Sequence, residues 1–166
     1  MVRVGSVTVE HTHDTFEDPR LGDVGLLFEA TSGIQRKLEP TWAAHGLSAL
    51  DAAALMRLSR SPAQRLRMTD LADQTQLSTS GVTRLVDRLE RNGLARREPD
   101  EKDRRTSYAA LTDAGADRLA KVLPEYLEML DTWFYGRLTA QQRDRLLEGL
   151  RIIRDATFPE ASRVSE

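Results

Sequence analysis

The chain has 166 residues, no cysteine and a formal net charge of -2. A chain of this length forms one elaborated domain more readily than two independent ones, and the lack of cysteine excludes disulfides, thiolate metal sites and cysteine redox sensing. The sequence has no run of about 18 apolar residues that would cross a bilayer, and its N-terminus lacks the apolar core of a secretory signal. We therefore expect a cytoplasmic protein with no membrane partner.

The charges are unevenly distributed along the chain. The first 30 residues carry a net charge of -4 and residues 113–166 a net charge of -2, whereas residues 31–112 hold 14 basic and 10 acidic side chains, a net charge of +4. A basic centre between acidic ends is expected when only the centre meets a polyanion. Taken alone this signal is weak, because charged faces are ordinary on surface helices.

The N-terminal part of the chain predicts two helices. Apolar residues at helical spacing indicate a long first helix over 23–45, which ends at Gly46. Pro40 lies inside this segment and is expected to bend or break the helix. Ser48, with Asp51 three residues later, forms the pattern of a capping box and predicts the start of a second helix.

The basic centre predicts two further helices joined by a tight turn. A short third helix is expected to begin with Thr69 as its cap, and a fourth to begin with Ser78 as its cap and to stop at Gly93. In the fourth helix one stripe is apolar at positions i, i+3, i+4 and i+7, which predicts a buried face made of Val82, Leu85, Val86 and Leu89.

A β-hairpin and two more helices complete the prediction. Short extended pieces at 95–98 and 106–111, joined by a long charged loop, indicate the hairpin. Thr112 is expected to cap a long fifth helix, and Thr139 with Gln142 makes a second capping box for a last helix. The expected fold is therefore mainly α with one small β-hairpin, and it contains no internal repeat.

The face of the fourth helix opposite the apolar stripe is polar and basic. Two short helices joined by a tight turn, the second basic on its outer side, form a helix-turn-helix, whose second helix fits the major groove of B-DNA. The charged hairpin tip beside it places Arg104 or Arg105 within reach of the neighbouring minor groove, where the negative potential is strongest. The outer face of the fourth helix consists of Ser80, Thr83, Arg84, Asp87, Arg88 and Arg91.

The segment from Arg67 to Gly115 resembles the winged helix-turn-helix of the MarR family of bacterial transcriptional regulators. The most specific part is the wing pattern Asp-x-Arg followed after five residues by Leu-Thr, which stands here as Asp103, Arg105, Leu111 and Thr112, together with the stretch VTRLVDRLERNGL. The flanking helices agree with the family in order and length. The resemblance implies a winged helix-turn-helix with long N- and C-terminal helices that interleave in a homodimer.

The resemblance also implies roles for individual residues. Ser80, Thr83 and Arg84 would face bases in the major groove, and Thr79 and Arg88 would contact phosphates. In the wing, Arg105 would enter the minor groove, oriented by a salt bridge from Asp103, with Arg104 as a further candidate contact. By contrast, we interpret Arg91, Arg96 and Arg97 as solvated surface arginines.

The sequence departs from the common family pattern at two positions. Gln76 occupies the turn where glycine is frequent, and Gly81 lies inside the recognition helix. Glycine at such a site costs about 1 kcal/mol of helix stability relative to alanine. It either allows close approach to DNA or is simply tolerated.

The resemblance implies a small-molecule effector, and the residues leave two interpretations of its binding site. Family members commonly bind a small aromatic or anionic molecule between the DNA-binding and dimer regions, which releases DNA. Here Phe28, Trp42 and His45 are candidates to line such a pocket, and the alternative is an aromatic cluster that packs the domain junction.

Catalysis and metal binding are not expected. The chain has no glycine-rich phosphate loop, no metal-binding helix motif and no nucleophile with an obvious base, so we expect no enzyme and no cofactor. His11 and His13 beside Asp14 suggest a metal site, but no further histidine cluster completes the coordination, and a flexible acidic tail is the favoured interpretation.

These observations predict a domain plan and a function. Residues 1–20 form an N-terminal extension, 21–47 and 113–158 a helical dimerisation region, 48–112 the DNA-binding region and 159–166 a tail. The predicted function is that of a homodimeric regulator, a repressor released by a small effector, which reads a pseudo-palindrome in double-stranded DNA. The alternative is an architectural winged-helix protein that binds DNA without sequence preference.

Overall fold

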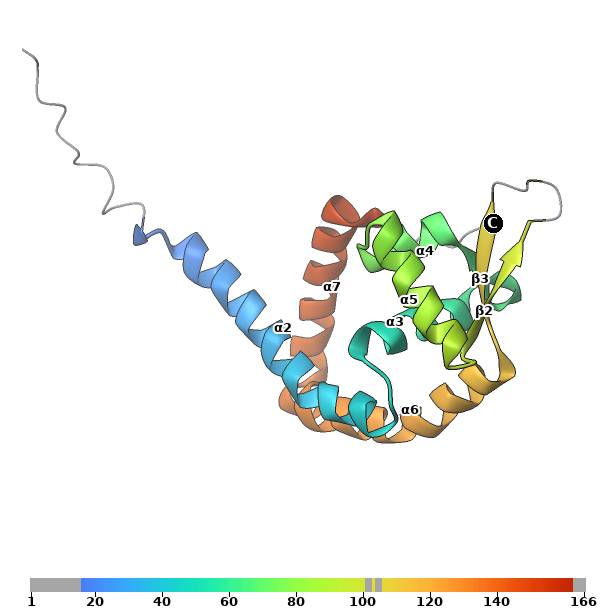
Figure 1. Ribbon diagram of the computed structural model, residues 1–166. Coiled ribbons are helices and arrows are strands. Elements are labelled where there is room, and N and C mark those ends of the chain that lie inside the picture. Colours follow the sequence, from blue (N-terminus) through green and yellow to red (C-terminus); the bar gives the residue numbers. More distant parts are fainter. Residues whose placement is uncertain (1–15, 101–102, 104–105, 163–166) are drawn as a thin grey trace, which may run out of the picture. The chain divides into compact units, whose positions relative to one another are not determined.

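The computed structural model describes residues 16–100, 103 and 106–162. Over this range the chain is mainly helical, with one small three-stranded sheet (Figure 1). It divides into an N-terminal unit that ends at Arg36 and a larger unit that starts at Lys37. The helices and the small sheet confirm the predicted fold, which is mainly α with a small hairpin. None of the helices in the described ranges is both long and apolar enough to span a bilayer.

The first two helices agree with the predicted elements. Helix α2 covers Pro19–Ala44, starting four residues before the predicted first residue. Pro40 lies inside α2, which continues to Ala44, so the expected break does not occur. Gly46 follows with φ of +71°, a backbone conformation that glycine adopts without strain. Helix α3 (Ala49–Arg60) starts with the predicted capping box.

The helix-turn-helix is formed by α4 (Met68–Thr75) and α5 (Thr79–Arg91). The predicted cap at Thr69 is wrong, because α4 begins one residue earlier and Arg67 precedes it without a side-chain cap. The turn passes through Gln76, whose φ of +55° is left-handed. This is the turn position where the family frequently has glycine, and the structure shows why glycine suits it.

The sheet contains one strand that the sequence did not reveal. Strands β2 (Ala95–Pro99) and β3 (Ser107–Leu111) form the predicted hairpin to within one residue. A third strand, β1 (Arg65–Arg67), pairs antiparallel with the other edge of β3, so the strand order is β1-β3-β2. The central position of β3 holds the hairpin to the segment that leads directly into α4.

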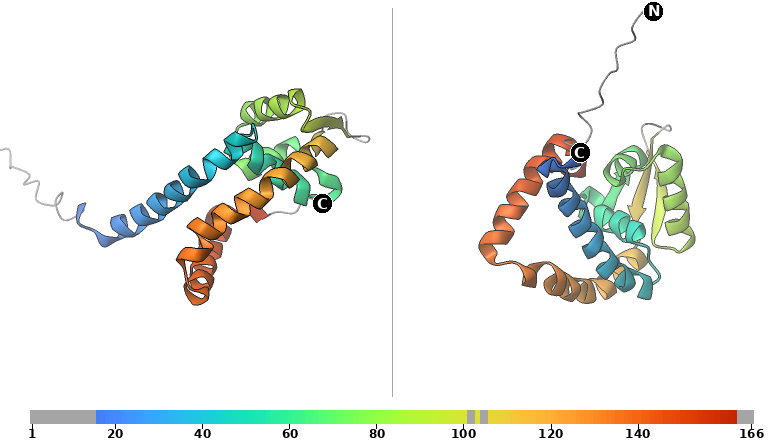
Figure 2. Two further views of the ribbon diagram at one scale, coloured as in Figure 1. Left: turned by 90° about the horizontal axis from the view of Figure 1, so that it is seen from below. Right: turned by 90° about the vertical axis from the view of Figure 1, so that its left-hand side faces the viewer.

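Two long helices follow the hairpin. Helix α6 (Asp113–Trp133) begins at the predicted cap Thr112 and packs against α3. Helix α7 (Ala140–Thr157) begins at the predicted capping box, and the short 3-10 helix η3 (Pro159–Ser162) at its end packs against α4 (Figures 1 and 2). The chain thus leaves the winged region, which comprises residues 48–112, along α6 and returns to the helix-turn-helix through α7 and η3.

Most of the hydrophobic core lies within the winged region, and Trp42 of α2 and Leu47 also belong to it. Helices α3, α4 and α5, the sheet and the first half of α6 all contribute to it, with Leu55, Leu58, Leu66, Leu71 and Leu85 among its fully buried side chains. In contrast, no side chain of α7 is buried, although α7 carries several large apolar residues. The core therefore fixes the position of α5, whereas α7 keeps apolar surface exposed.

Candidate nucleic-acid interface

Helix α5 presents two chemically different faces. Its start is fixed by Ser78, whose hydroxyl accepts a hydrogen bond of 3.2 Å from the backbone N–H of Gly81. Its end is marked by Gly93, with φ of +69°. Between them the four predicted apolar residues are at most 1% exposed, which confirms the buried stripe of Val82, Leu85, Val86 and Leu89.

The opposite face of α5 is exposed and polar. Thr79, Ser80, Thr83 and Arg84, four of the predicted DNA contacts, all have exposed side chains. The Arg84 Nε donates to the Ser80 carbonyl at 3.3 Å, an interaction that uses only part of its guanidinium group. Hydroxyl and guanidinium groups in the first half of a helix are the groups that read base edges in a major groove. Arg91, which we interpreted as merely solvated, lies on this same exposed face.

Arg88 lies on the flank of α5 that faces α3 and binds a carboxylate there. Its Nε and Nη2 atoms donate to Asp51 Oδ1 at 2.9 and 2.7 Å. Asp51 Oδ2 in turn accepts from the backbone N–H and the hydroxyl of Ser48, at 3.0 and 2.7 Å. This pair joins the recognition helix to the N-terminus of α3. No local sequence pattern indicates this pair, because the two residues are 37 positions apart, and the phosphate contact expected of Arg88 stays a prediction.

The environment of Asp51 shifts its titration. Burial on its own raises the pKa of the Asp51 carboxyl, but the hydrogen bonds from Arg88 and Ser48 outweigh burial and hold the pKa below its usual value. A carboxyl with a depressed pKa in the folded state stabilises the fold above its unfolded pKa of about 3.9. This contribution is lost as the pH falls through the lower, folded-state pKa.

Asp51→Asn is expected to lower the free energy of unfolding by about 2 kcal/mol at pH 7, less than for a fully buried pair because the Arg88 side chain is 41% exposed. Urea unfolding at several pH values measures this. The difference between wild type and variant should stay constant from about pH 7 to 5 and shrink below about pH 4. Asp113→Asn, the same change at the exposed first turn of α6, is the matched control. A pH-independent difference would contradict this assignment.

Arg97 of β2 lies on the other flank of α5 and binds two carboxylates of that helix. Its Nη2 atom is 2.6 Å from Asp87 Oδ1 and its Nη1 atom 3.4 Å from Glu90 Oε2. The backbone N–H of Arg97 also donates to Glu90 Oε1 at 3.1 Å, and its Nη2 atom donates to the Thr83 carbonyl at 3.2 Å. Arg97 is therefore not the solvated arginine that we interpreted it to be, since it connects the wing to the recognition helix.

The tip of the wing is described only at Asp103. Its backbone N–H donates to Asp100 Oδ1 at 2.9 Å, and its Oδ2 accepts from the Thr106 hydroxyl at 3.0 Å. These bonds shape the loop between β2 and β3. Arg104 and Arg105 lie outside the described residues, so their contacts and the expected salt bridge between Asp103 and Arg105 stay predictions.

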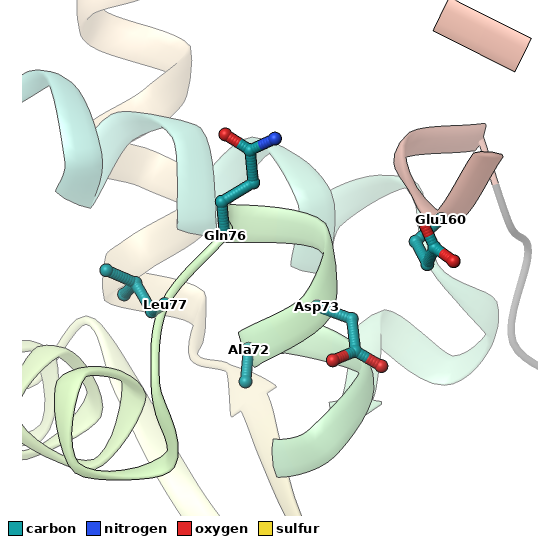
Figure 3. A pocket seen from close by; sticks show the side chains of 5 residues that line it. All are labelled: Ala72, Asp73, Gln76, Leu77 and Glu160. Carbon is teal, nitrogen blue, oxygen red and sulfur yellow. The ribbon is translucent and has the colours of Figure 1, made fainter. Parts of the chain in front are cut away.

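Two pockets of more than 300 Å³ flank α4 in the described part of the chain. One, of about 320 Å³, is polar and lies between the turn of the helix-turn-helix and η3 (Figure 3), and it is lined by Ala72, Asp73, Gln76, Leu77 and Glu160. The other, of about 330 Å³, is more apolar and lies between α4, α5 and the wing, lined by Met68, Thr69, Ala72, Thr79, Val82, Thr83, Asp87, Arg97 and Ser107. The ion pair between Arg97 and Asp87 therefore forms part of the wall of a space beside the recognition helix.

Comparison with known proteins identifies the family. A family model described as MarR family matches residues 45–106. The crystal structure of AbsC, a MarR family transcriptional regulator from Streptomyces coelicolor, is 30% identical over 84% of this chain and 94% of its own, with a TM-score of 0.78. The chain belongs to the MarR family. It is therefore a winged-helix transcriptional regulator and not an enzyme.

Other MarR-family relatives agree. Sco3205 of S. coelicolor, crystallised in complex with DNA, is 32% identical over 78% of this chain and 82% of its own, with a TM-score of 0.74. The HTH-type transcriptional repressor YetL of Bacillus subtilis is 30% identical over 73% of this chain and 74% of its own. The uncharacterised regulator YkoM of the same organism is 35% identical over 62% of this chain. The matched part of the chain spans 65% of the length of YkoM, just under two thirds.

The three residues expected to line an effector pocket lie in different settings. Trp42 is 4% exposed and packs on Tyr126 with 4.3 Å between ring centroids. This contact agrees with the alternative interpretation, an aromatic cluster that packs the domain junction. His45 Nε2 is 3.2 Å from Glu125 Oε2. Phe28 is 65% exposed on the N-terminal unit. The effector pocket stays a prediction, and His11 and His13 lie outside the described residues.

Proposed function

We propose that this MarR-family chain is a sequence-specific DNA-binding regulator that acts as a homodimer on a pseudo-palindromic operator. The observation that carries this proposal is the exposed polar row on α5, directly opposite its buried stripe. Ser80, Thr83 and Arg84 would contact base edges in the major groove, and Thr79 would contact a phosphate. Arg104 and Arg105 of the wing would reach the minor groove, with Asp103 orienting Arg105.

Exposed apolar side chains outside the winged region support the homodimer. On α6 and α7 these are Leu127, Leu146, Ile152 and Ile153, of which Leu127 is 55% and Ile152 is 66% exposed. The N-terminal unit adds exposed apolar residues of its own, Leu21, Val24, Leu26 and Phe28. Exposed apolar surface of this extent is typical of a protein interface. A second copy of the chain would bury it through the dimerisation region of residues 21–47 and 113–158.

Repression and release by a small effector complete the proposal. The relative YetL is a repressor by name, and Sco3205 was crystallised with DNA, which supports a regulator that acts by occupying its operator. The effector would be a small aromatic or anionic molecule. Its binding would change the spacing of the two recognition helices, and release follows because both half-sites must be engaged together.

Fluorescence anisotropy tests the proposed function. The purified protein is titrated into labelled DNA from upstream of its own gene and into a shuffled duplex, at near-physiological salt. We expect a preference of about a thousandfold or more for the upstream DNA. Equal binding to both duplexes, with only the salt dependence of phosphate contacts, would instead favour the architectural alternative.

A further inference from the structure

We propose that Arg97 supports DNA binding without touching DNA, by neutralising two carboxylates of the recognition helix, one in the row that faces DNA and one on the adjoining flank. This inference rests on the proposed function and names a residue that positions charge within the same site. Arg97 belongs to the wing, whereas both carboxylates, Asp87 and Glu90, belong to α5.

The position of Asp87 explains why its charge matters. Residues 80, 84, 87 and 91 lie at helical spacing on one face of α5, opposite the buried stripe. Asp87 therefore lies between Arg84 and Arg91 in the row that we place against DNA. An unpaired carboxylate in that row would face phosphates of like charge.

The charge balance of α5 depends on Arg97. Of the three arginines on the helix, Arg88 is already paired with Asp51 of α3. The other two, Arg84 and Arg91, carry two positive charges, and Asp87 and Glu90 cancel them. The Arg97 guanidinium lies 2.6 Å from Asp87 Oδ1 and 3.4 Å from Glu90 Oε2. Its positive charge therefore makes the net charge of this surface positive, which favours binding to DNA.

The geometry of Arg97 favours this role over direct contact with DNA. Its side chain is only 33% exposed. Its guanidinium group already contacts the Asp87 carboxylate, the Glu90 carboxylate and the Thr83 carbonyl. These contacts use three of the five N–H donors of the guanidinium and hold the group against α5, whereas its charge still acts over a Debye length of about 8 to 10 Å.

A charge-rescue experiment tests the proposal. Arg97→Met keeps the aliphatic part of the side chain and removes its charge, so the affinity for the preferred duplex should fall about tenfold. Adding Asp87→Asn and Glu90→Gln to Arg97→Met removes the two exposed negative charges. This triple variant should recover more than half of the loss on a logarithmic scale. Arg96→Met is the matched control, since it removes the same charge from the neighbouring residue of β2. Arg96 forms its ion pair with Glu98 of the wing and not with α5.

The outcomes separate neutralisation from other roles of Arg97. The reference is the double variant Asp87→Asn with Glu90→Gln, which removes both carboxylates while Arg97 is present. If Arg97 contacted DNA, or only connected the wing to α5, removing the two carboxylates would raise the affinity by the same factor with Arg97 as with Arg97→Met. A gain that is no larger in the Arg97→Met background would therefore overturn the proposal, as would an Arg97→Met affinity equal to that of the Arg96→Met control. A wild-type chain that binds neither duplex would overturn the proposed function together with this inference.

Discussion

Gly115→Ala is expected to lower the free energy of unfolding by about 3 kcal/mol. Gly115 lies in the first turn of α6, where it packs against the chain that leaves the recognition helix. A Cβ atom at this position would lie 2.1 Å from the Leu94 carbonyl oxygen and 2.8 Å from a methyl group of Leu111. The Leu94 carbonyl cannot simply move away, because it accepts a hydrogen bond from the Thr112 backbone at 3.2 Å.

Urea unfolding followed by circular dichroism measures this effect. Ala114→Gly, a change of one methyl group at the preceding, exposed residue, is the control, and it should cost no more than about 1 kcal/mol. Gly115→Ala should also weaken DNA binding, since the same junction fixes the end of α5 through the 2.6 Å bond from the Thr112 hydroxyl to the Gly93 carbonyl. Equal stability of Gly115→Ala and wild type would show that α6 does not pack on this turn.

Leu127→Asp is expected to convert the proposed dimer to monomers at micromolar concentration. Leu127 lies on α6 beyond the part of the helix that contributes to the core, and it is 55% exposed. In the homodimer we place this side chain in the interface, where a buried and unpaired carboxylate is strongly unfavourable. Because the side chain is exposed in the single chain, the fold of the winged region should remain intact.

Sedimentation velocity separates the two states. Lys121→Gln on the same helix changes the net charge by the same amount at an exposed position, and this variant should remain dimeric. Far-ultraviolet circular dichroism checks that Leu127→Asp is folded. A variant that is folded and fully dimeric would place the interface elsewhere.

Features determined by neighbouring residues could be predicted from the sequence. The capping boxes at Ser48 and Thr139 were both correct, because a cap is formed by residues three positions apart. The buried stripe of α5 follows from its periodicity alone. Strand β1 was not predicted, because it has only three residues and is stabilised by pairing with β3, about 40 residues later in the chain. No local pattern signals such a pairing.

The roles of the arginines could be predicted only in part. Arg84 was placed correctly on an exposed face of α5, because the face follows from helical spacing. The partners of Arg88 and Arg97 were missed, because Asp51 is 37 residues from Arg88 and the link between Arg97 and α5 crosses from a strand to a helix. Whether a surface arginine is free or paired depends on tertiary contacts, which a single sequence does not reveal.

Dimethyl sulfate footprinting on the preferred duplex tests the central claim most directly, because this reagent modifies guanine N7 in the major groove. The wild-type protein should protect guanines in two clusters about 10 base pairs apart, one for each recognition helix. Arg84→Ala should lose protection of one guanine in each cluster while still binding DNA at low salt. Bound protein that leaves every guanine N7 reactive would contradict insertion of α5 into the major groove.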